Sequence, residues 1–218
     1  MVSTVQRPPG LRAGFHAEAG DRFSGLLHAG EQWAPARFLI TPHTHPVWEL
    51  YLQVHGRTRW LAGGQLVTLQ PGHLLAVAPE AEHHMREQPG GNHHFYFAAV
   101  NVATVLARRP ALGPAWQQVP PVVHRADGQL LTGAFDQLIR ELTARRQFAA
   151  DGLALAVDRL VLEVSRQLLE TSELSITAIG LEVGFGSGQH LARVFGRLTG
   201  CTPREYRLAF GGRPLVTG

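Results

Sequence analysis

The spacing of apolar residues changes near residue 128 and divides the chain into two parts. Between residues 31 and 101, short apolar runs are separated by Gly and Pro turns, a pattern that predicts β-strands. The expected strands are 33–40, 48–54, 57–61, 66–69, 74–78 and 94–100. Short strands with regularly spaced turns are typical of an antiparallel sandwich or barrel. Residues 102–127 contain scattered prolines and glycines and are expected to form a connecting segment.

Beyond residue 128, apolar residues recur every three or four positions, as they do on one face of a helix. Two amphipathic helices are predicted, which carry Phe135, Leu138, Ile139 and Leu142 and then Leu155, Val157, Leu160, Val161, Val164, Leu168 and Leu169. Three shorter helices are expected at about 176–182, at about 188–199 and from Thr202 onward. The sequence therefore predicts an α+β protein, with a β domain and its connecting segment at 1–127 and an all-α domain at 128–218.

The composition excludes several classes of protein. Hydrophobic residues make up 44% of the chain and charged residues 17%, which excludes a disordered chain and a charge-rich coiled coil. The single cysteine, Cys201, cannot form an internal disulfide. The chain has no run of 18 apolar residues, and its start lacks the apolar segment of a signal peptide. We therefore expect a cytoplasmic protein with no membrane partner.

Histidine is concentrated in one part of the chain, since eight of the 12 histidines lie in residues 43–94. His43, His45 and Glu49 all have odd numbers, so on an extended chain their side chains share one face. With a third imidazole from a later strand, this set suits a divalent metal such as Zn, Ni, Fe, Mn or Cu, and leaves one coordination position open. The same residues could instead line a polar pocket that holds no metal.

The histidine-rich stretch resembles the cupin family. The pattern His43-x-His45-x3-Glu49-x6-Gly56 fits the first cupin motif, and Gly72, Pro79 and His84 fit the second, with His83 as a one-residue alternative. Arg37 and Ala81 stand where the family has Gly. The resemblance implies a cupin-like antiparallel β-barrel whose metal ligands are His43, His45, Glu49 and His84. In such a pocket, Tyr51, Gln53 and Trp48 are expected to line the wall.

The C-terminal part has the layout of a helix-turn-helix. A short helix from Ser175 is followed by a turn at Gly184 and by a second helix whose polar face is suited to the major groove of DNA. Residues 186–218 contain five arginines and one acidic residue, which favours contact with phosphates. The residues expected to contact double-stranded DNA are Ser187, Gln189, His190, Arg193, Arg197, Arg204 and Arg207.

The segment from Ser175 to Arg207 resembles the distal helix-turn-helix of AraC/XylS-type transcription regulators. It reads Ser-Ile-x2-Ile-x3-Val-Gly-Phe-x-Ser, then Arg-x-Phe, and then Gly-x-Thr-Pro-x2-Tyr-Arg. The family's usual order is a cupin-like sensor followed by this module, so the two resemblances support each other. The family also has a proximal helix-turn-helix, which is not recognisable here. A single recognition helix per chain binds DNA weakly, and we therefore expect a homodimer.

These patterns lead to one main hypothesis and two alternatives. The main hypothesis is a ligand-responsive transcription regulator, not an enzyme, in which a small-molecule effector binds a metal-containing cupin pocket and alters DNA binding. The first alternative is a metal-dependent cupin enzyme, either an oxygenase or an isomerase. The second is a truncated regulator that works through protein–protein contacts. An enzyme has no need for the pattern at residues 175–207, which is what separates it from the regulators.

Overall fold

The computed structural model describes residues 13–18, 24–86, 91–116, 119–143, 147–170, 189, 192–193, 196 and 202–205. The chain forms two compact units. The first comprises residues 1–108 and 120–163, and the second comprises residues 109–119 and 164–218. Each unit is described separately below. None of the helices among the described residues is long and apolar enough to cross a membrane.

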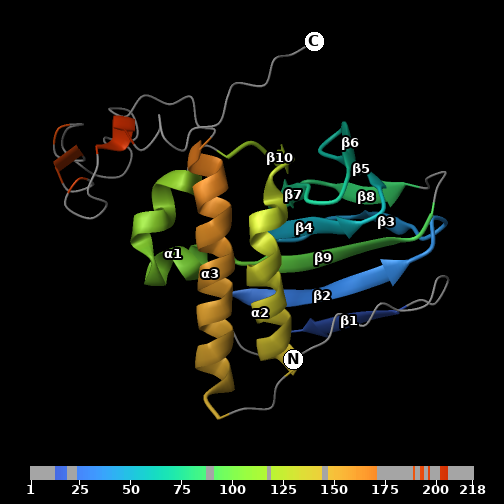
Figure 1. The fold of residues 1–218 in the computed structure, drawn as a ribbon, viewed down its shortest axis with the longest axis horizontal. Coiled ribbons are helices and arrows are strands. Elements are labelled where there is room, and N and C mark those ends of the chain that lie inside the picture. Colours follow the sequence, from blue (N-terminus) through green and yellow to red (C-terminus); the bar gives the residue numbers. More distant parts are fainter. Residues whose placement is uncertain are drawn as a thin grey trace. The chain divides into compact units, whose positions relative to one another are not determined.

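The first unit contains two antiparallel sheets (Figure 1). The larger has the order β1 (Ala13–Glu18), β2 (Leu26–Ala34), β9 (His93–Val100), β4 (Trp48–His55), β7 (Leu74–Val77) and β10 (Val122–Arg125). The smaller has the order β3 (Ile40–His43), β8 (His83–Arg86), β5 (Thr58–Ala62) and β6 (Gln65–Leu69). The predicted class, a cupin-like antiparallel β domain followed by helices, is confirmed.

The hydrophobic core lies between the two sheets. Tyr51 and Phe95 from the large sheet pack with Trp60 and Met85 from the small one, and all four are buried. Successive residues of a strand face opposite ways, so Tyr51 faces this core whereas Leu52 belongs to the outer face of the same strand. The alternation that the sequence predicted therefore decides which side chains of β4 enter the space between the sheets.

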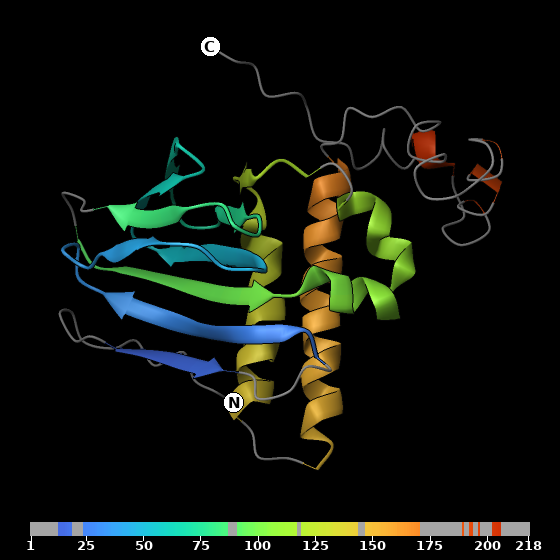
Figure 2. The same cartoon turned by 180° about the vertical axis from the view of Figure 1, so that it is seen from behind.

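The first unit also contains helices, namely α1 (Val102–Arg108), α2 (Thr132–Thr143), a 3-10 helix at Gly128–Leu131 and the first part of α3 (Ala149–Glu170). The 3-10 helix at Pro110–Trp116 belongs to the second unit. Helix α2 packs on the outer face of the large sheet. Phe135 of α2 stacks on Tyr96 of β9 with ring centroids 5.5 Å apart, and the Tyr96 hydroxyl donates a 2.6 Å hydrogen bond to Asp136. Figure 2 shows α2 beside the upright α3. The apolar face of α2 is thus buried against the sheet, as its period predicts.

Two expectations from the sequence were wrong. The strand expected at 33–40 is two strands, because Pro35 has no N–H to donate and its carbonyl accepts a 2.9 Å hydrogen bond from the Phe38 amide in a turn. The connecting segment expected at 102–127 contains α1, a 3-10 helix and β10. Burial of Val102 and Val105 stabilises α1, and β10 gains its hydrogen bonds from β7, a partner distant in sequence.

A charge pair connects α1 to α3 within the first unit. The Arg108 guanidinium donates to one carboxylate oxygen of Asp158 through Nε at 3.2 Å and through Nη2 at 2.6 Å. The same Nη2 donates to the carbonyl of Ser24 at 2.8 Å. Asp158 is 7% exposed, and the positive charge of Arg108 compensates its buried negative charge.

In the second unit, the described residues between 189 and 205 follow the expected helices. Gln189, Ala192, Arg193 and Gly196 are helical, and Gln189 and Arg193 are exposed one turn apart. The expected capping box is confirmed, because the Thr202 amide donates to the Glu205 carboxylate at 2.7 Å and the Glu205 amide donates to the Thr202 hydroxyl at 3.1 Å. Arg204 is exposed. Four expected DNA contacts lie outside the described residues, namely Ser187, His190, Arg197 and Arg207.

Candidate metal centre

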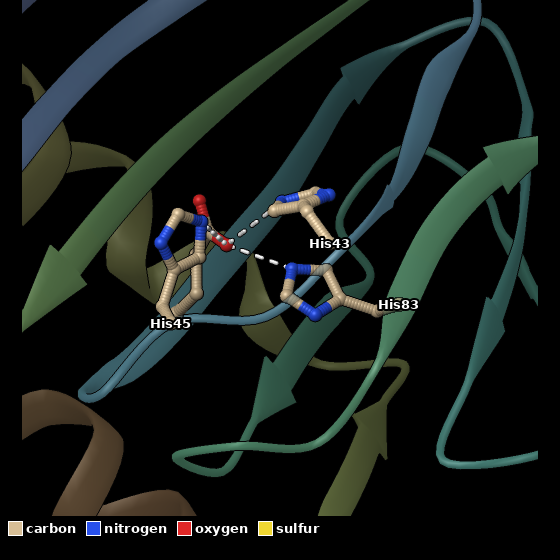
Figure 3. Close-up of side chains that lie close together, drawn as sticks. His43, His45 and His83 are labelled. Carbon is tan, nitrogen blue, oxygen red and sulfur yellow. Dashed lines mark hydrogen bonds and ion pairs between the residues drawn. The ribbon is translucent and has the colours of Figure 1, made fainter.

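Glu49 is the centre of the histidine cluster. It lies on β4 between β9 and β7, faces the space between the sheets and is 3% exposed. Its Oε2 is 2.8 Å from Nε2 of His83, 3.0 Å from Nε2 of His45 and 3.6 Å from Nε2 of His43. Figure 3 shows the three imidazoles converging from different segments of the chain. The four ligand atoms all lie within 4.8 Å of one another, a group that could hold a metal ion.

Two of the imidazoles are held by the backbone. His43 Nδ1 lies 2.8 Å from the Thr41 carbonyl oxygen, and His83 Nδ1 lies 2.9 Å from the Ala81 carbonyl oxygen. A carbonyl only accepts a hydrogen bond, so each Nδ1 carries a proton and donates it. The opposite nitrogen of each ring, Nε2, is thereby directed at Glu49. Metal-binding histidines are oriented in this way by their second nitrogen.

The structure brings His83 to the cluster, and it does not bring His84, the expected fourth ligand, there. His83 pairs directly with His43 across β3 and β8. His84 is the next residue of β8 and faces the other way, with a buried Nδ1 that has no hydrogen-bond partner among the described residues. The loop before β8 also departs from the cupin motif, because Ala81 stands where the motif has Gly. The preceding residue, Glu80, has a positive φ of 62°. This loop decides which of the two histidines faces inward.

The cluster shifts the proton affinities of its members. Burial alone would raise the pKa of Glu49, but hydrogen bonds from the imidazoles outweigh it and hold this pKa well below its usual range. The hydrogen bond to Glu49 raises the pKa of His43, although desolvation opposes it. Burial lowers the pKa of His45, although the charge of Glu49 opposes it. Glu49 is therefore ionised at neutral pH, and His43 holds a proton more readily than His45.

The three expected pocket residues have different positions. Tyr51 lies beside the cluster, with its hydroxyl 3.3 Å from His83 Nε2, and burial raises its pKa well above the usual value, so it remains protonated. Gln53 shares this face, but its side-chain amide is hydrogen-bonded to neighbouring strands and does not face the cluster as a free group. Its Nε2 donates to the carbonyls of His55 at 2.7 Å and His94 at 3.3 Å, and its Oε1 accepts from the Thr58 hydroxyl at 2.6 Å.

Two residues lie where the sequence did not predict them: Trp48 lies away from the cluster, and His28 lies beside it. Trp48 precedes Glu49 on β4, so it belongs to the outer face of the sheet and away from the cluster. His28, to which the sequence assigned no role, lies on β2 with Nε2 3.2 Å from Glu49 Oε1. Its ring is 5.1 Å from the ring of His45. His28 reaches the cluster because β2 and β4 both pair with β9. Knowledge of this strand pairing would have identified His28, whereas the spacing of residues along the chain could not.

Two family models match the chain. The AraC-like ligand binding domain matches residues 27–161, and a helix-turn-helix domain matches residues 139–209. The first match alone covers more than half of the chain and includes the cluster and the strands that follow β1. The chain belongs to the AraC family. This AraC-family protein is a ligand-responsive transcription regulator, with a cupin-like sensor domain followed by an AraC-type helix-turn-helix. Its architecture is that of a regulator.

The solved structures similar to this AraC-family chain are distant from it. Apo ToxT from Vibrio cholerae is 9% identical, covers 89% of this chain and 100% of its own, and has a TM-score of 0.44. A cupin superfamily protein from Desulfitobacterium hafniense is 13% identical, covers 44% and 84%, and has a TM-score of 0.37. The Cupin_2 domain of an XRE family transcriptional regulator from Enterobacter cloacae is 17% identical, covers 40% and 93%, and has a TM-score of 0.35.

None of the curated proteins compared with this chain matches it. The assignment to the AraC family therefore rests on the two family models. The helix-turn-helix match begins at residue 139, upstream of the distal unit expected at 175–207. Within the described residues 147–170, however, α3 is one uninterrupted helix without the turn of a proximal unit.

Proposed function

We propose that the sensor domain of this AraC-family regulator binds a divalent metal ion through His43, His45, Glu49 and His83. The observation that carries this proposal is the orientation of His43 and His83, whose Nδ1 protons are donated to backbone carbonyls. In a neutral imidazole with a proton on Nδ1, Nε2 carries a lone pair. Such a lone pair facing an ionised carboxylate repels it, so each ring either takes up a second proton on Nε2 and donates it to Glu49 or shares a metal cation with Glu49.

The distances within the cluster support the same proposal. Two ligands bound to one ion at about 2.1 Å lie about 3.0 to 3.4 Å apart in octahedral or tetrahedral geometry. The contacts of Glu49 Oε2 with the three Nε2 atoms measure 2.8, 3.0 and 3.6 Å, which brackets this range. Three imidazoles and one carboxylate suit Zn, Ni, Fe or Mn.

Access to the cluster supports a role in sensing. The side chains of His43 and His45 are 27% and 21% exposed, whereas those of His83 and Glu49 are almost completely buried. The ligand set is therefore rigid on one side and open on the other. When bound, the metal would supply a Lewis acid on which a small-molecule effector can bind through an oxygen or nitrogen atom. We propose that effector binding at this open side alters DNA binding by the helical domain.

Metal analysis of the purified protein tests the site. The parent should contain about one metal ion per chain, and His83→Ala and the double variant His43→Ala, His45→Ala should lose it. His84→Ala is the matched control, because it is the neighbouring imidazole on the same strand and should keep the metal. If the parent protein binds no metal after exposure to Zn²⁺, Ni²⁺, Fe²⁺ and Mn²⁺, the proposed metal site is wrong. A loss in His84→Ala that His83→Ala does not share would show that the ligand set is wrong.

We also propose that the C-terminal helices contact double-stranded DNA through Ser187, Gln189, His190, Arg193, Arg197, Arg204 and Arg207. The exposure of Gln189 and Arg193 one turn apart supports a recognition face. Site selection with random DNA should yield a preferred sequence, and Arg193→Ala with Arg197→Ala should weaken binding at least tenfold. Arg159→Ala, an exposed arginine of α3, is the control. A parent that binds no DNA at low salt would favour the regulator that works through protein contacts.

A homodimer acting in the cytoplasm completes the proposal. Two copies would place two recognition helices on DNA about one helical turn apart, which a single copy cannot do. The described part of α3 offers Leu155, which is 57% exposed, whereas Val161 is fully buried within its own chain and is unavailable to a partner. Sedimentation of the purified protein gives its oligomeric state directly, and a monomer at the concentration that saturates DNA would contradict the dimer.

A further inference from the structure

The second oxygen of Glu49 also has a partner, and it comes from outside the proposed ligand set. His28 Nε2 lies 3.2 Å from Glu49 Oε1, whereas the three proposed ligands all lie around Oε2. Glu49 is ionised and can only accept a hydrogen bond, so His28 Nε2 carries a proton and donates it. Oε1 of Glu49 therefore accepts a hydrogen bond from His28, whereas Oε2 faces the three proposed metal ligands.

The strand pairing explains how His28 reaches Glu49. His28 on β2 and Glu49 on β4 both pair with Ala99 of β9, one from each side. Ala99 is fully buried, and its methyl group is too small to separate the two longer side chains above it. Around the imidazole of His28 lie the rings of His16 at 5.2 Å, His45 at 5.1 Å and Phe97 at 6.0 Å. The side chain is 13% exposed and is fixed by this packing.

We propose that His28 is a positioning residue that keeps Glu49 a one-oxygen metal ligand, and thereby keeps one coordination position open for the effector. This inference rests on the proposed metal site. A carboxylate can bind a metal through one oxygen or through both. The hydrogen bond from His28 occupies Oε1, so a metal held by the three imidazoles gains only Oε2. Without that hydrogen bond, Oε1 is released to take the position that an effector would otherwise use.

The test uses the full-length protein loaded with Co²⁺, whose visible absorption reports its coordination number. His28→Leu removes the hydrogen-bond donor, and His28→Gln restores one from an amide of similar reach. The His28→Leu variant should still bind one Co²⁺ per chain, but with weaker and shifted visible absorption because Glu49 then binds through both oxygens. Azide, a small anion that competes for an open position, should bind this variant about tenfold more weakly than the parent. The His28→Gln variant should return the parent spectrum and azide affinity.

The possible failures are distinguishable. A parent that takes up no Co²⁺ overturns the metal site, and the role of His28 with it. A parent that binds Co²⁺, together with a His28→Leu variant of unchanged spectrum and azide affinity, overturns only the role of His28. A His28→Leu variant that is folded by circular dichroism but binds no Co²⁺ also overturns it, because His28 would then be a ligand. A His28→Gln variant that behaves like His28→Leu contradicts the hydrogen bond as the cause.

Discussion

Replacing Asp158 by alanine should destabilise the sensor domain through the charge that it leaves behind. Arg108 makes two hydrogen bonds to one oxygen of Asp158, and its side chain is 21% exposed while that of Asp158 is 8% exposed. Removing one member of such a pair leaves the other charge uncompensated, which costs about 3 kcal/mol at the partly exposed end of the usual range. Arg108→Met should cost about the same, since Asp158 then loses the two hydrogen bonds and the positive charge of Arg108.

The double variant separates this cause from simple loss of packing. With both charges removed, no uncompensated charge remains, so the double variant should cost less than either single variant, about 1 to 2 kcal/mol, which implies a coupling energy of about 4 to 5 kcal/mol. Urea unfolding of the parent, both single variants and the double variant, followed by tryptophan fluorescence, provides the four free energies. Arg159→Met on the exposed face of α3 is the control and should cost under about 1 kcal/mol. Additive single-variant effects would refute the reasoning.

Three further predictions concern pH, metal binding and backbone geometry. Burial, together with the charge of His94, lowers the pKa of His93 from 6.5 to about 4. The unfolded chain therefore binds more protons between these values, and in the presence of a chelator the free energy of unfolding should fall by up to about 3 kcal/mol as pH decreases from 6.5 to 4. In urea titrations, His93→Phe should flatten that slope, and an unchanged slope would assign it to other groups. Because its hydrogen bond to Glu49 raises the pKa of His43, Zn²⁺ uptake near neutral pH should release protons, which calorimetry in two buffers of different ionisation enthalpy detects. Gly56 has φ of 70°, and an added Cβ would clash with the Asn92 carbonyl oxygen, so Gly56→Ala should cost about 3 kcal/mol or more. Gly64→Ala should cost about 1 kcal/mol, because nothing lies within 4 Å of its added Cβ; equal costs in urea unfolding would contradict the clash.

The sequence predicted those parts of the site that depend on local geometry. The odd spacing of His43, His45 and Glu49 placed them on one face, and the structure brings all three together. The same parity correctly placed Tyr51 and Gln53 on the face of Glu49. The prediction for Tyr51 and Gln53 succeeds because alternation along β4 is a property of the backbone itself. His43, His45 and Glu49 do not share one strand, and it is the bend at residues 44–47, between β3 and β4, that brings their side chains together.

The remaining parts depend on contacts between distant segments. The choice between His83 and His84 is decided by the loop before β8 and by its pairing with β3, a one-residue difference that reverses the facing of every side chain. His28 lies 21 residues before Glu49 and reaches it only because β9 lies between their strands. The strand β10 was missed for a similar reason, since its short sequence becomes a strand only beside β7.

The small sheet ends in a weakly held strand that carries one member of the cluster. β3 has four residues, lies at the edge of its sheet, and pairs with β8 only at Ile40 and His43, with an irregularity between them. Glu49 belongs to the other sheet, so an ion bound here would act as a removable cross-link between the two sheets. Of the ligand-bearing strands, β3 has the fewest other restraints. Hydrogen exchange at the amides of β3 should therefore slow more on metal binding than exchange at the amides of β4. The exchange rate of β3 would then report directly whether the sensor domain holds a metal ion.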